Sequence, residues 1–259
     1  MQTHPGPYAW VASELAGTPF ASIAYVEETG STNADAAALL SDERARGHTI
    51  VAEFQRTGFG RKARSWMALP GTALLFTTIL PRAIAAQRLW IVPFWVALAV
   101  RGALAERGVR ALLQWPNDLL LAEGKLAGIL CQSRVTGSDA SVACGVGINI
   151  VRLPGAAAGI EPPPAFCDDA APVERSALLR SILTAYDATL ATLDDPQRVA
   201  AAWERAADLP GRRYTIRRDG EPQPFEATAQ RLADGGGLEV VRDDGAAETV
   251  ALADARVLR

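Results

Sequence analysis

Hydrophobic and polar positions along the chain predict short strands that follow one another in hairpins, while the helices gather in separate stretches. Alternating or continuous apolar segments that are typical of strands occupy residues 24–29, 51–55, 72–80, 112–114, 119–135 (as a hairpin) and 141–151. Parallel strands need a helix between them, and most of these strands have none. The pattern therefore favours an α+β domain with a mixed or mainly antiparallel sheet and packed helices.

The helical segments are predicted at residues 31–47, 86–107, 174–193 and 196–207. Thr32 and Asp35 precede an Ala/Leu segment at the spacing of a capping box. Pro93 lies inside the second segment and predicts a kink or a break there. These helices are expected to cover the sheet rather than to alternate with its strands.

The pattern changes after Leu209-Pro210-Gly211. Short segments with β-type alternation follow, separated by turns rich in Asp and Gly, at residues 212–218, 225–232, 238–243 and 248–253. We therefore expect two domains, residues 1–208 and a small β-barrel of residues 209–259.

Composition excludes several classes of protein. The chain of 259 residues has 49% hydrophobic residues and a formal net charge of −3, so it can bury a core but has no basic surface suited to coating a polyanion. Cys131, Cys144 and Cys167 are odd in number and show no CxxC spacing, which argues against a disulfide framework or a zinc cluster. A reducing cytoplasm is the simplest location.

Membrane insertion and export are also not expected. The longest apolar run, residues 89–100, is short and is interrupted by Pro93. The first residues lack a basic segment followed by an unbroken apolar stretch.

One loop concentrates positive charge beside glycines. TGFGRKARSW, residues 57–66, holds Arg61, Lys62 and Arg64, although the whole chain has only two lysines, Lys62 and Lys125. The glycines permit close approach to the backbone and the cations supply charge-assisted hydrogen bonds, so the loop suits a carboxylate and a phosphate held together. The alternative is a solvated basic turn. A dinucleotide loop is excluded because the segment leads into Pro70 rather than into a helix.

Five segments in order resemble the motifs of biotin protein ligases: STN at 31–33, EFQRTGFGRKARSW at 53–66, WPND at 115–118, KLAGIL at 125–130 and GVGIN at 145–149. The resemblance covers about residues 24–150, and the carboxy-terminal segment is similar to the SH3-like domain of such ligases. It implies a catalytic domain of the class II aminoacyl-tRNA synthetase and biotin ligase type.

The resemblance implies an activity and its partners. Biotin and ATP, with Mg²⁺, give biotinyl-5′-AMP and pyrophosphate, and the biotinyl group then passes to a lysine of a biotin carboxyl carrier domain of acetyl-CoA carboxylase or a related carboxylase. Only about 25 residues precede the first predicted strand, too few for a helix-turn-helix domain, so DNA binding is not expected. A homodimer stays open.

The resemblance also assigns roles to individual residues. Catalysis falls to Arg61, Arg64 and Lys125. The expected biotin-binding residues are Ser31, Thr32, Asn33, Gln55, Gly58, Phe59, Gly60, Arg61, Lys125 and Gly145. The expected ATP-binding and adenylate-binding residues are Arg61, Arg64, Trp66, Asn117, Lys125 and Asn149, with Gly147 beside them and Asp118 linked to the metal.

Three positions depart from the family pattern. Phe59 replaces an arginine, Ala63 a glycine, and Gln114 the lysine that precedes Trp-Pro-Asn. Gln114 removes a charge for which the sequence offers no replacement. Two alternatives therefore stay open: a binder of biotin or a related acid with little transferase activity, and a lipoate ligase.

Overall fold

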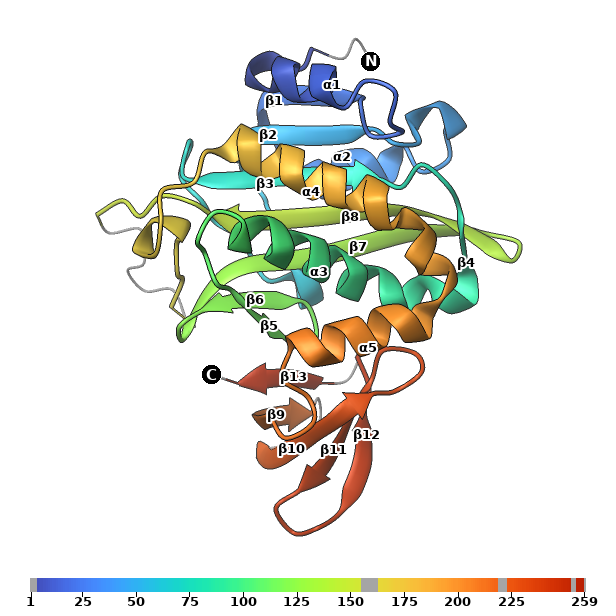
Figure 1. Ribbon diagram of the computed structural model, residues 1–259, viewed down its shortest axis with the longest axis vertical. Coiled ribbons are helices and arrows are strands. Elements are labelled where there is room, and N and C mark those ends of the chain that lie inside the picture. The colour runs from blue at the N-terminus through green and yellow to red at the C-terminus, as the bar shows by residue number, and fades with distance from the viewer. Residues whose placement is uncertain (1–3, 155–162, 219–222, 253–254, 259) are drawn as a thin grey trace.

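Two β-sheets organise the chain. The computed structural model describes residues 4–154, 163–218, 223–252 and 255–258. A large sheet forms the middle layer of the larger unit, and a small sheet lies at the carboxy-terminal end of the molecule (Figure 1).

The large sheet is mixed, as the sequence predicts. Its strands are β1 (Ile23–Thr29), β2 (Thr49–Gln55), β3 (Ala73–Ile79), β4 (Ile84–Ala85), β5 (Leu112–Gln114), β6 (Asp118–Leu121), β7 (Gly124–Thr136) and β8 (Asp139–Asn149). Their order is β1-β2-β3-β8-β7-β6-β5, with β4 paired to β8. Only β1 and β2 pair in parallel among the described strands, and the segment that joins them contains a helix.

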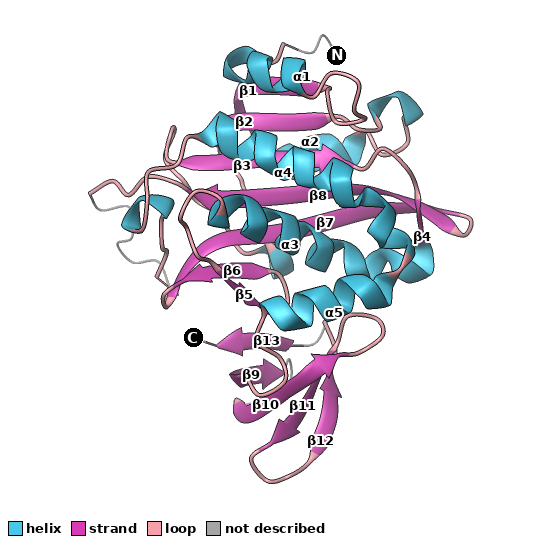
Figure 2. Ribbon diagram, in the orientation of Figure 1, coloured by secondary structure: helices cyan, strands magenta, loops and turns pink. Residues whose placement is uncertain are grey.

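Helices cover both faces of this sheet. The helices are α1 (Ala9–Glu14), α2 (Thr32–Ala38), α3 (Val92–Ala105), α4 (Arg175–Thr189) and α5 (Pro196–Ala206). α3 and α4 lie over one face, α2 lies behind the sheet on the other, and α5 lies between the two sheets (Figure 2). The main core forms under α3 and α4, where Trp95 stacks on Tyr186 with ring centroids 4.6 Å apart.

Alternation along β8 separates two environments. Cys144, Val146 and Ile148 belong to the main core under the helices. Gly145 and Gly147 point to the opposite face, because successive side chains of a strand alternate. This opposite face, which α2 partly covers, carries the candidate site.

The predicted helix of residues 31–47 is wrong in its extent. α2 ends at Ala38, and Leu40 turns into a small core with Ile50. A separate 3-10 turn, Glu43–Ala45, then begins where the Asp42 carboxylate accepts the backbone N–H of Arg44.

The predicted capping box is also wrong. Ser31 is the N-cap of α2, and its side chain makes no capping hydrogen bond. The Thr32 hydroxyl bonds Thr77, while Asp35 accepts a hydrogen bond of 2.6 Å from the Thr29 hydroxyl. Tertiary contacts therefore take both side chains away from the helix end.

The helical segment is divided near Pro93, as the sequence predicts, and Pro93 is the second residue of α3. A 3-10 helix (Ala86–Ile91) precedes α3, and Pro93 stands in the first turn, where a missing N–H costs nothing. By length and composition, residues 86–105 could cross a membrane, but 56% of the apolar stretch is buried inside the protein. The segment serves as the central helix of the main core.

The small sheet consists of five antiparallel strands. They are β9 (Arg213–Arg218), β10 (Phe225–Leu232), β11 (Leu238–Arg242), β12 (Ala247–Val250) and β13 (Ala255–Leu258), in the order β12-β11-β10-β9-β13. The strand predicted at residues 248–253 is wrong in its extent. β12 ends at Val250, and Ala253 lies outside the described residues. β13 was not predicted, because its four residues owe their conformation to pairing with β9.

The two sheets meet at a glycine turn. Gly236 lies against the main core: a Cβ there would stand 2.7 Å from Leu252 Cδ1 and 3.1 Å from a ring carbon of Phe94. Its carbonyl accepts the indole N–H of Trp115 at 3.0 Å. The turn therefore holds the small sheet against the segment after β5.

Gly236→Ala should destabilise the protein more than Gly235→Ala. Both glycines have positive φ, +81° and +88°, so both variants pay about 1–2 kcal/mol of backbone strain. Only Gly236 lacks room for a methyl group, which adds about 1–3 kcal/mol. Urea unfolding of the two variants measures the difference, and equal losses would contradict the contact.

Candidate active site

The basic loop between β2 and β3 folds back on itself. Gly60 N–H donates to the Arg64 carbonyl at 2.7 Å, and Trp66 N–H donates to the Gly58 carbonyl at 2.8 Å. Lys62 occupies the tip with φ 54°. Gly58 is required here, because a Cβ would stand 2.6 Å from the Trp66 carbonyl oxygen. The loop thus delivers the Trp66 ring to the sheet.

Trp66 lies across two glycines of the large sheet. Gly128 of β7 and Gly147 of β8 are directly opposite each other, and a Cβ on either would approach the Trp66 ring to 3.0 or 2.7 Å. The buried indole Nε1 has no hydrogen-bond partner among the described residues. The glycine pair therefore provides a flat floor that the Trp66 ring occupies, and the indole carries an unused donor.

Lys125 extends over the same floor. Its Nζ lies 5.5 Å from the centroid of the Trp66 ring and 2.7 Å from Asp118 Oδ1. The Lys125 and Asp118 side chains are 28% and 17% exposed, so the ammonium is partly desolvated yet open to a ligand. Hairpin pairing of β6 with β7 brings the two residues together.

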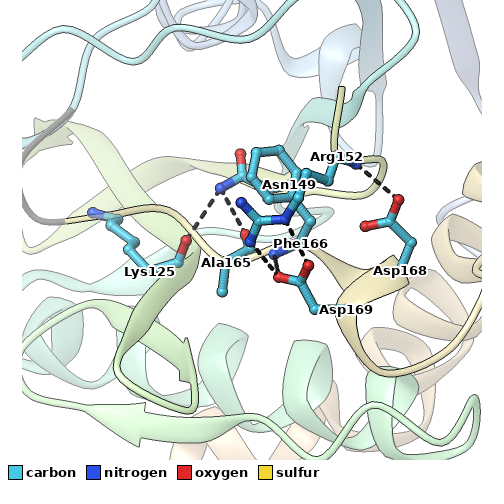
Figure 3. A network of polar contacts seen from close by, with 7 residues as sticks. All are labelled: Lys125, Asn149, Arg152, Ala165, Phe166, Asp168 and Asp169. Carbon is cyan, nitrogen blue, oxygen red and sulfur yellow. Dashed lines mark hydrogen bonds and ion pairs between the residues drawn. The ribbon is translucent and has the colours of Figure 1, made fainter. Parts of the chain in front are cut away.

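The backbone of Lys125 is held by the segment after residue 162. Lys125 N–H donates to the Pro163 carbonyl, and Ala165 N–H donates to the Lys125 carbonyl at 2.9 Å. The Asn149 side-chain amide donates to the carbonyls of both Lys125 and Ala165 at 3.1 Å (Figure 3). Asn149, predicted to lie near adenine, therefore also fixes the strand that carries Lys125.

An ion pair holds the same segment in place. Arg152 donates to both oxygens of Asp169, at 2.7 and 2.6 Å, and Asp169 also accepts the Phe166 N–H (Figure 3). Arg152 N–H donates to Asp168. Hydrogen bonding to Arg152 lowers the pKa of Asp169, so the carboxylate stays ionised at neutral pH. The guanidinium covers the Phe166 ring at 4.5 Å.

Gln55 and Thr32 connect the end of β2 to α2. Gln55 Oε1 accepts from the Thr32 backbone N–H at 2.8 Å and from its hydroxyl at 3.1 Å. The Thr32 hydroxyl also bonds the Thr77 hydroxyl of β3. Ser31, at the N-cap of α2, is buried beside them.

Asn33 faces the sheet from α2. Its Nδ2 donates to the Leu130 carbonyl at 3.0 Å, and a Cβ on Gly145 would stand 2.8 Å from the same nitrogen. The Asn33 Oδ1 atom is buried and has no hydrogen-bond partner in the described part of the chain. A buried acceptor without a donor costs free energy, so the arrangement suits a ligand that supplies an N–H.

Arg61 bridges two parts of the molecule. One guanidinium nitrogen lies 3.5 Å from Asn117 Oδ1, and another donates to the Leu252 carbonyl of the carboxy-terminal unit. Asn117 in turn donates to the Ile129 carbonyl at 2.8 Å. Arg64 is exposed, and Phe59 forms a short bridge with Ser65. The structure therefore brings Arg61 to Asn117, near Lys125, and leaves Arg64 at the surface.

Arg212 brings a positive charge to the side chain of Gln114. Gln114 is buried, and its Oε1 accepts from Arg212 Nη2 at 2.7 Å, while Arg212 Nη1 donates to the Leu113 carbonyl. In the register of β5 and β6, Gln114 stands opposite Asp118. Sequence reasoning missed Arg212, because nothing links residues 98 positions apart before the chain folds.

The assembled site suits a planar group, an adjoining anion and a ligand with N–H donors. Arg61 and Lys125 provide positive charge, and the glycine pair provides close backbone approach. Among the described residues, no group of three or more His, Cys, Asp or Glu side chains could hold a metal ion. Asp118 is therefore a single carboxylate, not part of a protein-built metal cage.

Comparison with known proteins finds a family similarity in the segment that carries the site. Residues 25–149 match the model of the biotin/lipoate A/B protein ligase family. The matched segment is just under half of the chain. It contains Lys125, the basic loop and the strand glycines; Arg212 and the small sheet lie beyond it.

Two curated relatives are similar to about half of the chain. The chain is 34% identical over 137 residues to a biotin–[acetyl-CoA-carboxylase] ligase of Paracoccus denitrificans and 32% identical over 148 residues to one of Mycobacterium tuberculosis. The matches cover 52% and 54% of this chain and 56% and 53% of those relatives, so the chain spans about half the length of the curated relatives it matches.

Solved structures establish the fold over nearly the whole chain. A biotin protein ligase from Aquifex aeolicus in complex with biotin and ATP matches with a TM-score of 0.72 and 20% identity. The match covers 92% of this chain and 99% of that one. The biotin/lipoate ligase fold predicted from the motifs is thus confirmed, whereas the roles of the individual residues stay predictions.

Gly147→Ala and Trp66→Ala should be strongly coupled. A methyl group at Gly147 overlaps the Trp66 ring. Gly147→Ala should therefore lower the free energy of unfolding more in the parent than in the Trp66→Ala background, by about 1–3 kcal/mol. Gly60→Ala is the matched control, because its Cβ would meet nothing closer than 3.8 Å. Unfolding free energies of the single and double variants measure the coupling; additive effects would show that Trp66 does not lie there.

Proposed function

We propose that this protein is an ATP-dependent ligase that activates biotin as biotinyl-5′-AMP and transfers the biotinyl group to a lysine of a biotin carboxyl carrier domain. The observation that carries the proposal is Lys125 beside the glycine floor, with its ammonium 5.5 Å from the Trp66 ring and Arg61 on the neighbouring wall. The names of the Paracoccus denitrificans and Mycobacterium tuberculosis relatives support the same substrate.

In the first step, a carboxylate oxygen of biotin attacks the α-phosphorus of ATP and pyrophosphate leaves. Two anions approach each other in this step, so nearby cations lower its barrier. Lys125 would contact the carboxylate and the α-phosphate, and Arg61 would stabilise the charge that develops on phosphate. Arg64 is proposed to reach the phosphates from its exposed position on the loop. The Phe59 and Gly60 backbone would close over the biotin carboxylate.

The biotin ring is proposed to lie between α2 and the sheet. A ureido group presents N–H donors and a carbonyl acceptor. The buried Asn33 Oδ1 fits such a donor, since the described residues offer it none. Ser31, Thr32 and Gln55 would line the rest of this pocket, with Gly58 and Gly145 providing close backbone approach.

Adenine is proposed to lie near Trp66, Asn117 and Asn149, on the side of the sheet where Trp66 covers Gly147. Mg²⁺ keeps several waters and is usually held by one or two carboxylates plus substrate phosphates. A single carboxylate at Asp118 fits that role, whereas a dedicated metal cage would not. Asp118 would then exchange its ion pair with Lys125 for the metal as Lys125 turns to the phosphate.

In the second step, the lysine amine of the carrier domain attacks the carbonyl carbon of the mixed anhydride and AMP leaves. No side chain of the ligase becomes covalently attached. We place the reaction in the cytoplasm, where carboxylase carrier domains with free lysines would be found. Homodimer formation stays open in this proposal.

A second function stays open because Phe59, Ala63 and Gln114 depart from the family pattern. The family model covers lipoate as well as biotin ligases. The protein would then bind or activate a related acid, or bind biotin with little transfer. The intact WPND and KLAGIL segments favour biotin.

The direct test is to incubate the protein with biotin, MgATP and the carrier domain of a biotin-dependent carboxylase. We expect the carrier to gain the mass of one biotinyl group on one lysine by mass spectrometry. Lipoate replaces biotin in a parallel reaction. Tight biotin binding without modification would favour the second function, and a gain from lipoate alone would reject biotin.

Lys125→Ala should lower adenylate formation by about 10²-fold or more, because a preorganised donor at developing charge is usually worth that much. Lys125→Arg keeps the charge but not the compact ammonium. Its rate of adenylate formation should therefore lie between those of the parent and Lys125→Ala. Arg110→Ala removes one exposed positive charge elsewhere and serves as the control. Pre-steady-state pyrophosphate release at saturating biotin and MgATP measures the rates. An unchanged rate in Lys125→Ala would remove Lys125 from the chemistry.

Gln114→Lys should change the rate by less than about tenfold, the equivalent of 1.4 kcal/mol, because Arg212 already provides a cation there. Arg212→Ala should slow pyrophosphate release, and Gln114→Lys should restore part of the rate in that background. Activation of a nearly inert parent by Gln114→Lys would instead identify a retired ligase that only binds.

A further inference from the structure

Two cysteines face each other across the central hairpin. Cys131 of β7 and Cys144 of β8 are directly opposite each other in the antiparallel register. Directly opposite residues have Cα atoms about 4.5–5.5 Å apart. A disulfide needs a Cα separation of about 4.4–6.8 Å. The backbone is therefore already placed for a bond between the two sulfur atoms.

The two thiols differ in access. Cys144 is completely buried under the helices, and its contact with Cys131, together with burial, raises the pKa of its thiol well above the usual value. Cys131 is partly exposed. Tyr186 of α4 is fully buried near Cys144. Burial and the Cys144 thiol raise the pKa of the Tyr186 hydroxyl well above the usual range. A small oxidant in solvent therefore reaches Cys131 first.

The third cysteine cannot compete. Cys167 is buried, which raises the pKa of its thiol to about 12. The next residue, Asp168, donates its N–H to the Ile150 carbonyl. Ile150 stands six residues along the chain from Cys144, about 20 Å at the rise of a strand. Only one pair of cysteines in the described chain is close enough to react.

We propose that Cys131 and Cys144 form a modification site that a peroxide converts to a disulfide within the β7–β8 hairpin. The Cys131 sulfur attacks a peroxide oxygen, giving a sulfenic acid and one water. The Cys144 sulfur then displaces the hydroxyl group, the S–S bond forms, and a second water leaves with the Cys144 proton. Two thiols lose two electrons in total, and one hydrogen peroxide is reduced to two waters.

The bond would act on the opposite face of the same strands. Leu130 and Gly145, the neighbours of the two cysteines, are also directly opposite each other. The Leu130 carbonyl accepts from Asn33, and Gly145 packs against the Asn33 amide. Because a disulfide imposes its own dihedral angle, closing it shifts the backbone on which Asn33 rests. This consequence rests on the proposed biotin pocket; the disulfide itself does not.

The chemical test uses the whole unmodified chain. After treatment with hydrogen peroxide and alkylation of the remaining thiols, peptide mapping without reductant should show one linked peptide joining Cys131 and Cys144, reversed by dithiothreitol. Cys167→Ser should behave like the parent, and Cys131→Ser should give no internal link. Sulfinic or sulfonic acid at Cys131 without the link, a link through Cys167, or a disulfide between chains would overturn the proposal.

The functional test compares biotin binding by calorimetry before and after oxidation. We expect the dissociation constant to rise by about threefold or more and to return after reduction. Cys167→Ser should show the same response, and Cys131→Ser should show none. An unchanged constant in the linked protein would overturn the connection to the pocket. A reduced protein that binds no biotin would instead overturn the proposed function, whatever the peptide map shows.

Discussion

The candidate site depends on the register between β7 and β8. The pairing continues from Ala127 opposite Ile148 to Thr136 opposite Asp139 and decides which side chains face the helices. This register turns the aliphatic side chains of β8 toward the main core and Gly145 and Gly147 toward the opposite face. A slip of one residue would exchange the faces. It would bury glycines under the helices and put large side chains where Trp66 now lies.

The small sheet is structurally part of this arrangement. Trp115 and Arg212 connect it to the strand before the Trp-Pro-Asn-Asp turn, and Leu252 receives Arg61 from the basic loop. The family model ends at residue 149, yet contacts from beyond that limit hold both walls of the site. The large-sheet part and the small-sheet part of the chain therefore both hold side chains of the candidate site in place.

Sequence patterns predicted the mixed sheet and the closeness of Trp66 and Asp118 to Lys125. They failed where distant contacts decide the local structure. Thr32 gives its hydroxyl to Thr77 rather than to a helix cap, and β13 forms because β9 is available to pair with it. Arg212 could not be predicted, because a cation beside Gln114 becomes visible only when the small sheet is in place.

The contact between Arg61 and the carboxy-terminal unit ends on a main-chain carbonyl. Any amino acid at position 252 carries that acceptor, so the side chain there is free to vary without loss of the bond. A change in the length of the preceding turn would move the carbonyl away. Among homologues, the coupling of the two units would therefore leave its trace in conserved spacing rather than in a conserved residue.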